Sequence, residues 1–416
     1  MSGTVIIGAG IIGCATAYYL SESPTTKAQD IHLVEVTEEL FCSSSGNAGG
    51  FLASDWFAPS VAPLGALSFK LHKELADANN GKQKWGYSPS TGASVTQGSV
   101  RGSSGFDWLR HDASRAEAAA KHDFYDGDGP AWLARTKGSK LEIISEDNTV
   151  AQVDPRRLSQ FLLDQCKARG VQFHHPARAV SVSKDMRDSL AMIKIQSASD
   201  GAQTDIPCTR LLLAAGAWTP NVYRTLFPSS TFQVPVSSLA GHHIVIKSPR
   251  WTTEHEPQGC HSVFTTDDSG FSPELISRIG GEVYVAGLND SSLNIPETPS
   301  GAQAMVHTDS IERLRKVATR MMIKEGGTED DIEVVKSGLC FRPITSSGRP
   351  ILSRIPDQKL GGGIHTLGGG EGGVFIAAGH GPWGISHSLG TGKVMAEMLE
   401  AKKTSVDVSA LTLGRL

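Results

Sequence analysis

The sequence lacks paired cysteines. Six cysteines are spread over its 416 residues, no two stand as CxxC, and none has the spacing to histidine that suits zinc. A chain of this length does not need disulfides to build a core. We therefore predict reduced thiols, no metal site and an intracellular location, most simply the cytoplasm.

Long apolar runs and strong net charge are also missing. No run approaches the roughly 20 apolar residues of a membrane span, and the start, MSGTVIIGAG, has no signal-peptide pattern. A formal net charge of −4 argues against a nucleic-acid-binding protein, which usually has a strongly basic face. The end, Gly414-Arg415-Leu416, resembles a peroxisomal address only in part, because its first residue is glycine, and the peroxisome stays an alternative location.

Glycine, in contrast, is abundant, with 45 of 416 residues, and several glycines are clustered. The first cluster, Gly8-Ala9-Gly10-Ile11-Ile12-Gly13, stands between an apolar strand at 4–7 and a helix at 11–20. A second strand follows at 30–35. Strand, helix and strand within about 35 residues make a βαβ unit with parallel pairing.

The glycines of this cluster have separate tasks. Gly8 makes the tight turn, Gly10 lets the backbone approach a pyrophosphate, and Gly13 lets the helix pack closely on the strand. The helix start at Ile11 and Ile12 offers free N–H groups to phosphates. Glu35, at the end of the second strand, is placed to accept hydrogen bonds from ribose hydroxyls. The pattern predicts a dinucleotide site.

Three further segments favour FAD over NAD. The loop SSSGNAGG, at 43–50, follows the second strand, and the strand RLLLAA, at 210–215, ends in Gly-Ala-Trp. A late cluster, GHGPWG at 379–384, precedes the last helix and would aim its positive end at the flavin. Beyond the first motif, the predicted cofactor-binding residues are Ser44, Ser45, Asn47, Ala48, Gly49, Val180, Ala215, Gly216, Trp218, Cys340, Gly379, Gly381, Gly384 and Ile385.

The rest of the chain suggests two interleaved domains. Residues 76–140 have a weak, loop-like pattern with one short helix at 113–121, and we interpret them as an insertion, either a lid or a solvated decoration. Helices are predicted at 156–169, 309–325 and 390–401, and short antiparallel strands over 233–335. We predict a cofactor domain of 1–60, 141–225 and 336–416, and a substrate domain of 61–140 and 226–335.

The order of these motifs resembles the FAD-dependent D-amino-acid oxidase superfamily, with its glycine oxidase and sarcosine oxidase branches. The resemblance rests on GAGIIG, SGNAGG, VDPRRL, LLLAAGAWT, GLCFRPITSSGRPIL and FIAAGHGPWGISHSLGTGKVMAEML. It implies an α/β fold, in which a Rossmann-type FAD-binding domain is interleaved with an α+β substrate domain built on a large antiparallel sheet. The stretch GNAGGFLASDW is similar to an uncharacterised fungal subgroup, some of whose members are linked to endosomal traffic.

The resemblance also implies roles for single residues. Arg342, before Pro343 and the Gly348-Arg349-Pro350 run, matches the arginine that binds the substrate carboxylate; a structural ion pair is the alternative. Cys340 matches a cysteine that is joined to the flavin in sarcosine-oxidase-like members; a buried, inert thiol is the alternative.

Three more residues are candidates for the substrate pocket: Tyr284 and Trp383 as lining residues, and His380 beside the flavin ring. Sarcosine oxidases use a lysine to activate oxygen, and Val285 stands at the matching position, which puts oxygen as the acceptor in doubt. The other histidines, His242, His243 and His387, are interpreted as structural or as polar pocket walls.

The resulting hypothesis is an FAD-dependent oxidoreductase that oxidises the C–N bond of an amino acid or secondary amine by hydride transfer to flavin N5. Its partners would be a small amine or amino-acid substrate and either O2 or another electron acceptor. Two alternatives remain open. One is an FAD-dependent hydroxy-acid dehydrogenase, and the other is a flavin-bearing trafficking or adaptor protein associated with endosomes.

Overall fold

A parallel sheet carries the amino-terminal motif. In the computed structural model, which describes residues 3–96, 115–119, 125–126, 129–134, 138–146, 148–266, 270–323 and 331–414, its strand order is β19-β20-β12-β1-β2-β8. All neighbouring strands are parallel except β19 and β20, which run antiparallel. The strands are β1 (Thr4–Ile7), β2 (Ile31–Val34), β8 (Gln172–His174), β12 (Arg210–Leu213), β19 (Ile351–Ile355) and β20 (Gly373–Ala378). Apart from β8, which lies at one edge and is only partly buried, these strands are mostly apolar and buried on both faces, so they form a covered central layer.

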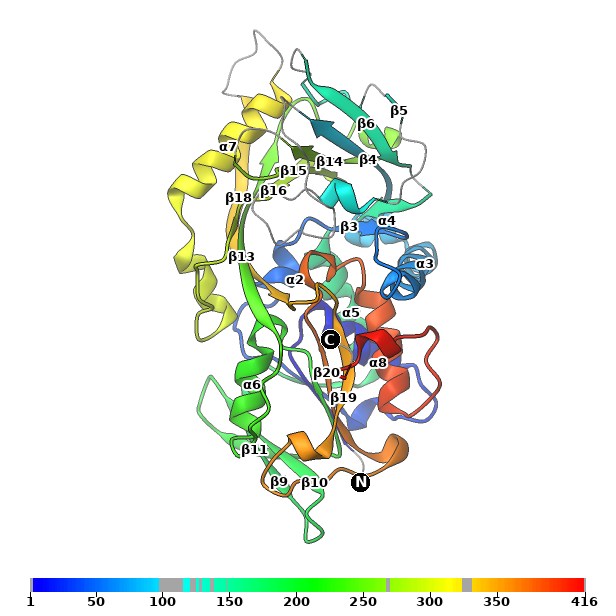
Figure 1. Ribbon diagram of the computed structural model, residues 1–416, viewed down its shortest axis with the longest axis vertical. Helices are drawn as coiled ribbons and strands as arrows, with labels where there is room; N and C mark the ends of the chain where they lie inside the picture. Colours follow the sequence, from blue (N-terminus) through cyan, green and yellow to red (C-terminus); the bar gives the residue numbers. More distant parts are fainter. Residues whose placement is uncertain are drawn as a thin grey trace.

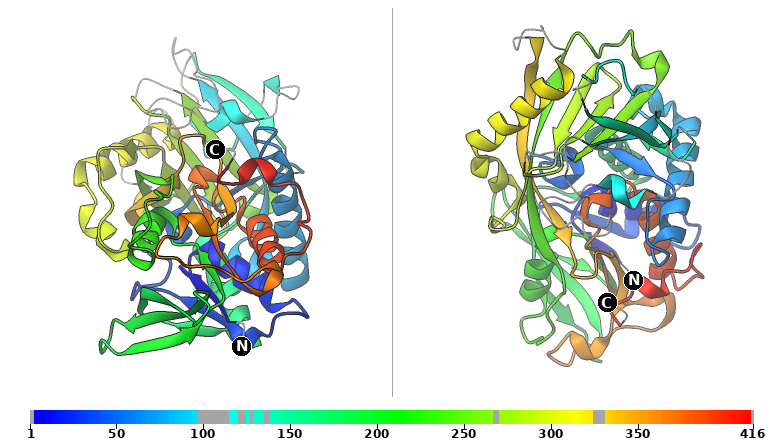
Figure 2. Two further views of the ribbon diagram at one scale, coloured as in Figure 1. Left: turned by 60° about the horizontal axis from the view of Figure 1, so that its bottom comes forward. Right: turned by 45° about the horizontal axis from the view of Figure 1, so that its top comes forward.

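Helices from both ends of the chain cover one face of this sheet. α1 (Ile11–Ser21) packs between α5 (Pro155–Arg169) and α8 (Ser388–Leu399), and α3 (Ala62–Asn79) packs on α8. Figure 2 shows the first segments, in blue, beside the last, in red. α5 begins with proline at its first position and Asp154 as its cap, whose carboxylate accepts a hydrogen bond from the Arg157 amide.

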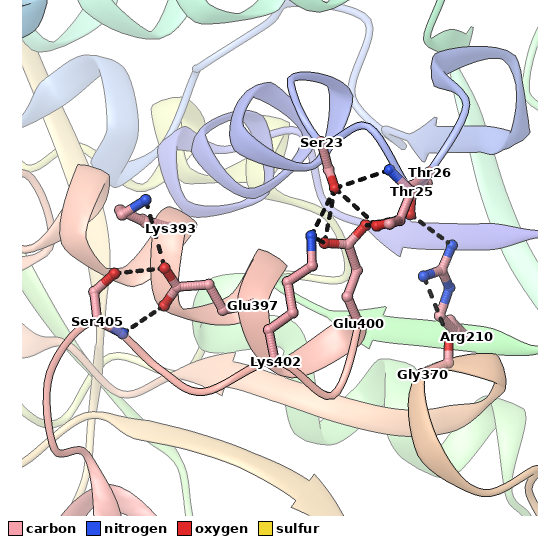
Figure 3. A network of polar contacts seen from close by, with 10 residues as sticks. All are labelled: Ser23, Thr25, Thr26, Arg210, Gly370, Lys393, Glu397, Glu400, Lys402 and Ser405. Atoms are coloured by element: carbon pink, nitrogen blue, oxygen red, sulfur yellow. Dashed lines mark hydrogen bonds and ion pairs between the residues drawn. The ribbon is translucent and has the colours of Figure 1, made fainter.

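Directly after α8, the side chain of Glu400 connects the carboxyl-terminal segment to the loop that follows α1 (Figure 3). The carboxylate of Glu400 accepts hydrogen bonds from the hydroxyls of Ser23, Thr25 and Thr26, and it pairs with Lys402 at 2.6 Å. Burial alone would raise the pKa of Glu400, but these donors outweigh it and lower the pKa to about 2. The carboxylate is therefore ionised at neutral pH.

The second sheet is larger and mixed (Figure 1). Its main path is β17-β13-β16-β15-β14-β4-β6-β5, while β18 pairs with β13 and β7 joins β3 to β4. All ladders are antiparallel except β4 with β14. Its strands are β3 (Phe51–Ala53), β4 (Ser88–Thr96), β5 (Tyr125–Asp126), β6 (Lys140–Ser145), β7 (Val150–Gln152), β13 (Ser237–Lys247), β14 (Cys260–Thr266), β15 (Glu274–Arg278), β16 (Glu282–Ala286), β17 (Asn289–Asp290) and β18 (Glu333–Ile344).

One helix covers this sheet on the side away from the parallel sheet. α7 (Thr308–Met322) packs against β13 and β16 and buries Leu314, Val317 and Met321 there (Figure 1). The opposite face of the large sheet turns toward α2 (Ser44–Asn47), which contacts β18. A third sheet of β9 (Ala177–Lys184), β10 (Leu190–Ser197) and β11 (Gln203–Pro207) precedes β12 and α6 (Thr219–Leu226).

The expectation of a loop-like insertion was wrong for its first part. Residues 81–85 form α4 (Gly81–Trp85), and 88–96 form β4, which lies between β14 and β6 in the large sheet. The strand escaped notice because its residues are small and polar, so that neighbours in the sheet rather than its own hydrophobicity hold it. Of the predicted helix at 113–121, the structure describes a 3₁₀ turn at Arg115–Ala118, while 113–114 and 120–121 lie outside the described residues. Most of 97–140 and the end of the chain at 415–416 also lie outside them.

The helices predicted outside the insertion are present within a few residues of their expected bounds, whereas α3 and α6 were not predicted. α7 and α8 begin and end close to the expected bounds, and β13 to β16 are the antiparallel strands expected over 233–335. The domain boundaries stay a prediction; β6 and most of β18 belong to the large sheet although both lie within the ranges predicted for the cofactor domain. Within the described part of the chain, no helix has both the length and the hydropathy that crossing a membrane requires.

Candidate cofactor and substrate site

A cavity of about 660 Å³ lies between the two large sheets. One side is formed by residues at the carboxyl ends of β1, β2, β12 and β20, where ligands usually bind in open parallel sheets. The other side is formed by residues of β15, β16 and β18. The cavity is in the size range of cofactor and small-molecule sites.

The glycine turn at one end of the cavity has the geometry that the sequence predicted. Gly8 has a φ of +103°, which favours glycine, and a Cβ there would lie 2.6 Å from the Ala214 carbonyl oxygen. A Cβ on Gly13 would lie 1.9 Å from the Gly8 oxygen, so only glycine lets α1 approach β1 this closely. The amide of Ile11, at the start of α1, donates to Ser45 Oγ at 2.9 Å.

Glu35 lies beside this turn and lines the cavity. Its Oε2 accepts a hydrogen bond from the Ala9 amide at 2.9 Å, and its Oε1 accepts from the amide and hydroxyl of Thr37 at 2.9 and 2.7 Å. A carboxylate has about four acceptor sites, so Glu35 keeps acceptor capacity toward the cavity. The side chain therefore braces the turn and still fits a ribose partner.

Most predicted cofactor residues line this one cavity. They are Gly8, Gly10, Ile11, Ile12, Glu35, Ser44, Ser45, Ala48, Gly49, Val180, Ala215, Gly216, Trp218, Cys340, Gly381, Gly384 and Ile385. Three others do not line it: Gly13 and Gly379 serve packing, since a Cβ on Gly379 would lie 2.5 Å from Thr345 Cγ2, and Asn47 turns its amide to the Cys42 carbonyl. Their functional roles remain a prediction.

The late glycine cluster meets the cavity differently from the expectation. α8 begins only at Ser388, and the cluster itself contains a 3₁₀ turn at Gly381–Trp383. Gly381, Gly384 and Ile385 line the cavity, but Ser388 does not. The turn, and not the start of α8, therefore borders the cavity, and the helix dipole lies farther from it than predicted.

Arg342 and Cys340 reach the cavity from the same face of β18, because alternate residues of a strand share a face. A Cβ on Gly241, in the neighbouring strand, would lie 2.6 Å from Arg342 Nη2, so glycine makes room for the guanidinium. Arg342 Nη1 donates to Asn289 Oδ1. Among the described residues Arg342 has no acidic partner, which argues against the structural ion pair.

The cavity-facing residue of β16 is Tyr284. Val285, whose position we compared with an oxygen-activating lysine, lies on the opposite face in the core under α7. Tyr284 lines the cavity, but its hydroxyl is already engaged, since it donates to the Asn47 carbonyl at 3.0 Å. Burial, above all, raises the pKa of the Tyr284 phenol, which stays protonated. No lysine lines the described part of the cavity.

Trp383 does not line the cavity, contrary to expectation. It packs against Phe51, Trp56 and Phe57, with ring centroids 5.1 to 6.5 Å away, and the Arg115 guanidinium lies 5.1 Å from its ring. Phe51 is the member of this aromatic cluster that reaches the cavity. Trp383 therefore supports the wall rather than forming it.

The histidines divide as expected into one at the cavity and several in the core. His380 lines the cavity, and its Nε2 hydrogen-bonds Thr391 Oγ1 at 3.1 Å. Burial lowers the pKa of His380 to about 3, so its ring is neutral at neutral pH. His242, His243 and His387 are buried and do not line this cavity.

Sequence reasoning missed one charged pair in the cavity wall. Arg115, from the insertion, donates Nε and Nη2 to the two carboxylate oxygens of Glu274, each at 2.6 Å. Both side chains line the cavity and both are largely buried. The two residues are 159 apart in sequence, and neither belongs to a recognisable motif, so no local signal could have joined them. Asn289 was missed for the same reason.

Taken together, the residues present fit FAD. A glycine turn without room for side chains, a neighbouring carboxylate and a helix start stand at one end of a cavity that continues to a guanidinium at the large sheet. This fold and this site define a dinucleotide-dependent oxidoreductase. The family model described as "FAD dependent oxidoreductase", DAO, matches residues 4–398, and the chain belongs to this family. It is therefore an FAD-dependent enzyme.

Individual relatives are distant. The Saccharomyces cerevisiae protein TDA3, whose name gives only a general oxidoreductase class, is 23% identical over 98% of this chain and 93% of its own length. Glycine oxidase from Geobacillus kaustophilus superposes with a TM-score of 0.71 at 17% identity, covering 100% of this chain and 99% of that one. Iminodiacetate oxidase from Chelativorans sp. BNC1 superposes with a TM-score of 0.70 at 18% identity, covering 98% of each chain. At this identity the structural likenesses show the fold.

Proposed function

We propose that this enzyme oxidises the C–N bond of a small amino acid or secondary amine that carries a carboxylate. The observation that carries the proposal is Arg342: a half-buried guanidinium that lines the FAD cavity and has no acidic partner among the described residues. Partial burial of a cation without an anion carries a desolvation cost, so such a site favours an anionic ligand. Glycine and iminodiacetate, the compounds in the names of two structural relatives, are both carboxylate-bearing amines.

The chain's own residues would then bind and orient the substrate. The Nε and Nη2 atoms of Arg342 would donate hydrogen bonds to the carboxylate, because Nη1 already donates to Asn289. Asn289 accepts this bond through Oδ1, which leaves its amide nitrogen to donate as a second carboxylate contact. FAD, when bound, would supply the acceptor for the hydride that leaves the carbon next to nitrogen.

The two titratable candidates of the substrate pocket, His380 and Tyr284, contribute no effective base. His380 is neutral and Tyr284 is protonated with its hydroxyl engaged, so neither takes a proton readily from an ammonium group. We therefore propose that the substrate reacts as the neutral amine, and that Phe51 and its aromatic neighbours keep water from that part of the cavity. Because no lysine lines the cavity among the described residues, we propose no residue that activates oxygen, and the acceptor is either oxygen or another molecule.

The test uses the purified holoenzyme under anaerobic conditions, with the loss of oxidised flavin absorbance as the readout. Matched pairs separate the carboxylate from the amine: glycine with methylamine, and sarcosine with dimethylamine, together with D- and L-amino acids. We expect the acids to bleach the flavin and the matched amines to bleach it far more slowly.

Two other outcomes would contradict the proposal. Bleaching by 2-hydroxy acids but by no amino acid would identify a hydroxy-acid dehydrogenase. No bleaching by any member of the panel, with FAD bound and reducible by dithionite, would favour the adaptor reading, in which FAD has a structural role.

A further inference from the structure

The backbone carbonyls of Gly46–Gly49, in the loop that follows the second strand, are all held by side chains from the large sheet. Lys336 Nζ contacts the Gly46 oxygen at 3.4 Å, and the Tyr284 hydroxyl donates to Asn47 at 3.0 Å. Arg278 Nη2 donates to Ala48 at 2.5 Å and to Gly49 at 2.9 Å, and Gln152 Nε2 donates to Gly49 at 2.7 Å. With four successive carbonyls fixed from behind, this loop cannot reorient without breaking several bonds.

Arg278 has an unusual position within this arrangement. Its residue is only 8% exposed, and its guanidinium donates to the Ala48 and Gly49 carbonyls alone. No acidic side chain pairs with it among the residues that the structure describes. A buried cation without an anion is destabilising unless something nearby compensates it. Ala48 and Gly49 line the FAD cavity, so the guanidinium of Arg278 lies directly behind a part of the cavity wall.

The neighbourhood of Arg278 is electropositive as well. Lys336 is half-buried, and burial, followed by the charges of Arg156 and Arg278, lowers its pKa. His243 stacks on Tyr284 with ring centroids 5.4 Å apart and has no hydrogen-bond partner at either ring nitrogen. Its burial, followed by the charges of Lys336, Arg278 and Arg342, lowers the pKa of His243 to about 3, so it adds no positive charge.

We propose that Arg278 is a positioning residue with two effects on FAD: its fork fixes the cofactor loop, and its charge stabilises negative charge on the bound cofactor. Geometry and charge can be separated, because lysine keeps the charge but loses the planar fork. Tyr284 offers the complementary change, since phenylalanine removes one loop contact and leaves every charge in place. The inference rests on FAD as cofactor and not on the proposed substrate.

The experiment measures two properties of Arg278→Met, Arg278→Lys and Tyr284→Phe: the dissociation constant of oxidised FAD from the apoprotein, and the two-electron midpoint potential of the holoenzyme. Neither needs a substrate, so a failed substrate panel does not affect the result. Arg250→Met is the matched control, because Arg250 also makes a two-pronged contact, with Asp331, but Asp331 does not line the cavity as Ala48 and Gly49 do.

In Arg278→Met we expect FAD to bind about 10-fold more weakly, because charge-assisted hydrogen bonds to the loop are lost. The affinity for reduced FAD, which carries more negative charge, should fall by about a further 10-fold. This difference lowers the midpoint potential by about 30 mV. Arg278→Lys should weaken binding but keep the potential near that of the wild type. Tyr284→Phe should weaken binding by a smaller factor without changing the potential, and Arg250→Met should change neither property.

The inference is overturned if Arg278→Met binds FAD with the affinity and potential of the Arg250→Met control. If Arg278→Met does not fold, the two milder variants decide the matter. Unchanged FAD affinity in both Arg278→Lys and Tyr284→Phe overturns the tethering role, and a potential in Arg278→Lys lower by about 30 mV overturns the role of the charge.

Discussion

Replacing Arg342 with glutamine tests the carboxylate site most directly. The structure leaves one edge of the guanidinium, Nε and Nη2, for a substrate, since Nη1 is bound to Asn289. Two charge-assisted hydrogen bonds at this half-buried site are worth about 1.5 kcal/mol each, the lower end of their range. Their loss, about 3 kcal/mol in all, corresponds to a fall of roughly 100-fold in kcat/KM.

The assay is rapid anaerobic mixing of the holoenzyme with the best amino-acid substrate and with the matching amine that lacks the carboxylate. The Arg342→Gln substitution should lower kcat/KM roughly 100-fold for the acid and leave kcat/KM for the amine almost unchanged. Arg342→Lys should recover part of the loss, because it keeps the charge without the fork. Equal losses for acid and amine, in a variant with the wild-type FAD content and Tm, would refute carboxylate binding by Arg342.

Three further predictions concern the cofactor and the stability of the fold. Gly13→Val should abolish FAD retention, because its Cβ would lie 1.9 Å from the Gly8 oxygen; a yellow purified variant with the wild-type FAD content would contradict this. If Cys340, which lines the cavity, is joined to FAD, acid-precipitated wild type stays yellow and Cys340→Ala releases its flavin, whereas colour in the wild-type supernatant excludes the link. The pKa of Glu400 is lowered to about 2 in the folded protein, from about 4.5 in the unfolded chain. Its carboxylate should therefore stabilise the fold fully at pH values above 4.5, and this contribution should disappear as the pH falls toward 2. Allowing for partial solvent contact, Glu400→Gln should cost about 2 kcal/mol in urea unfolding at pH 7 and little at pH 2, so a pH-independent difference would refute the assignment.

The local parts of the cofactor site could be predicted from the sequence. A strand, a glycine turn and a helix start involve residues close together in the chain, so their steric demands appear directly in the residue types. Gly8, Gly13 and Glu35 are therefore placed as the spacing indicated, and β1, α1 and β2 begin and end within one residue or so of expectation. The antiparallel strands β13 to β16 also followed from alternation and turn residues.

Tertiary structure alone decided which side chains face the cavity and what they contact. The sequence by itself determined the cofactor turn and the class of fold, but β4 is a strand because β14 and β6 flank it. It is the pairing of β16 with β15 and β13 that turns Tyr284, and not Val285, toward the cofactor loop. Arg115 meets Glu274 across 159 residues. Such contacts depend on long-range packing, which no short window of sequence contains.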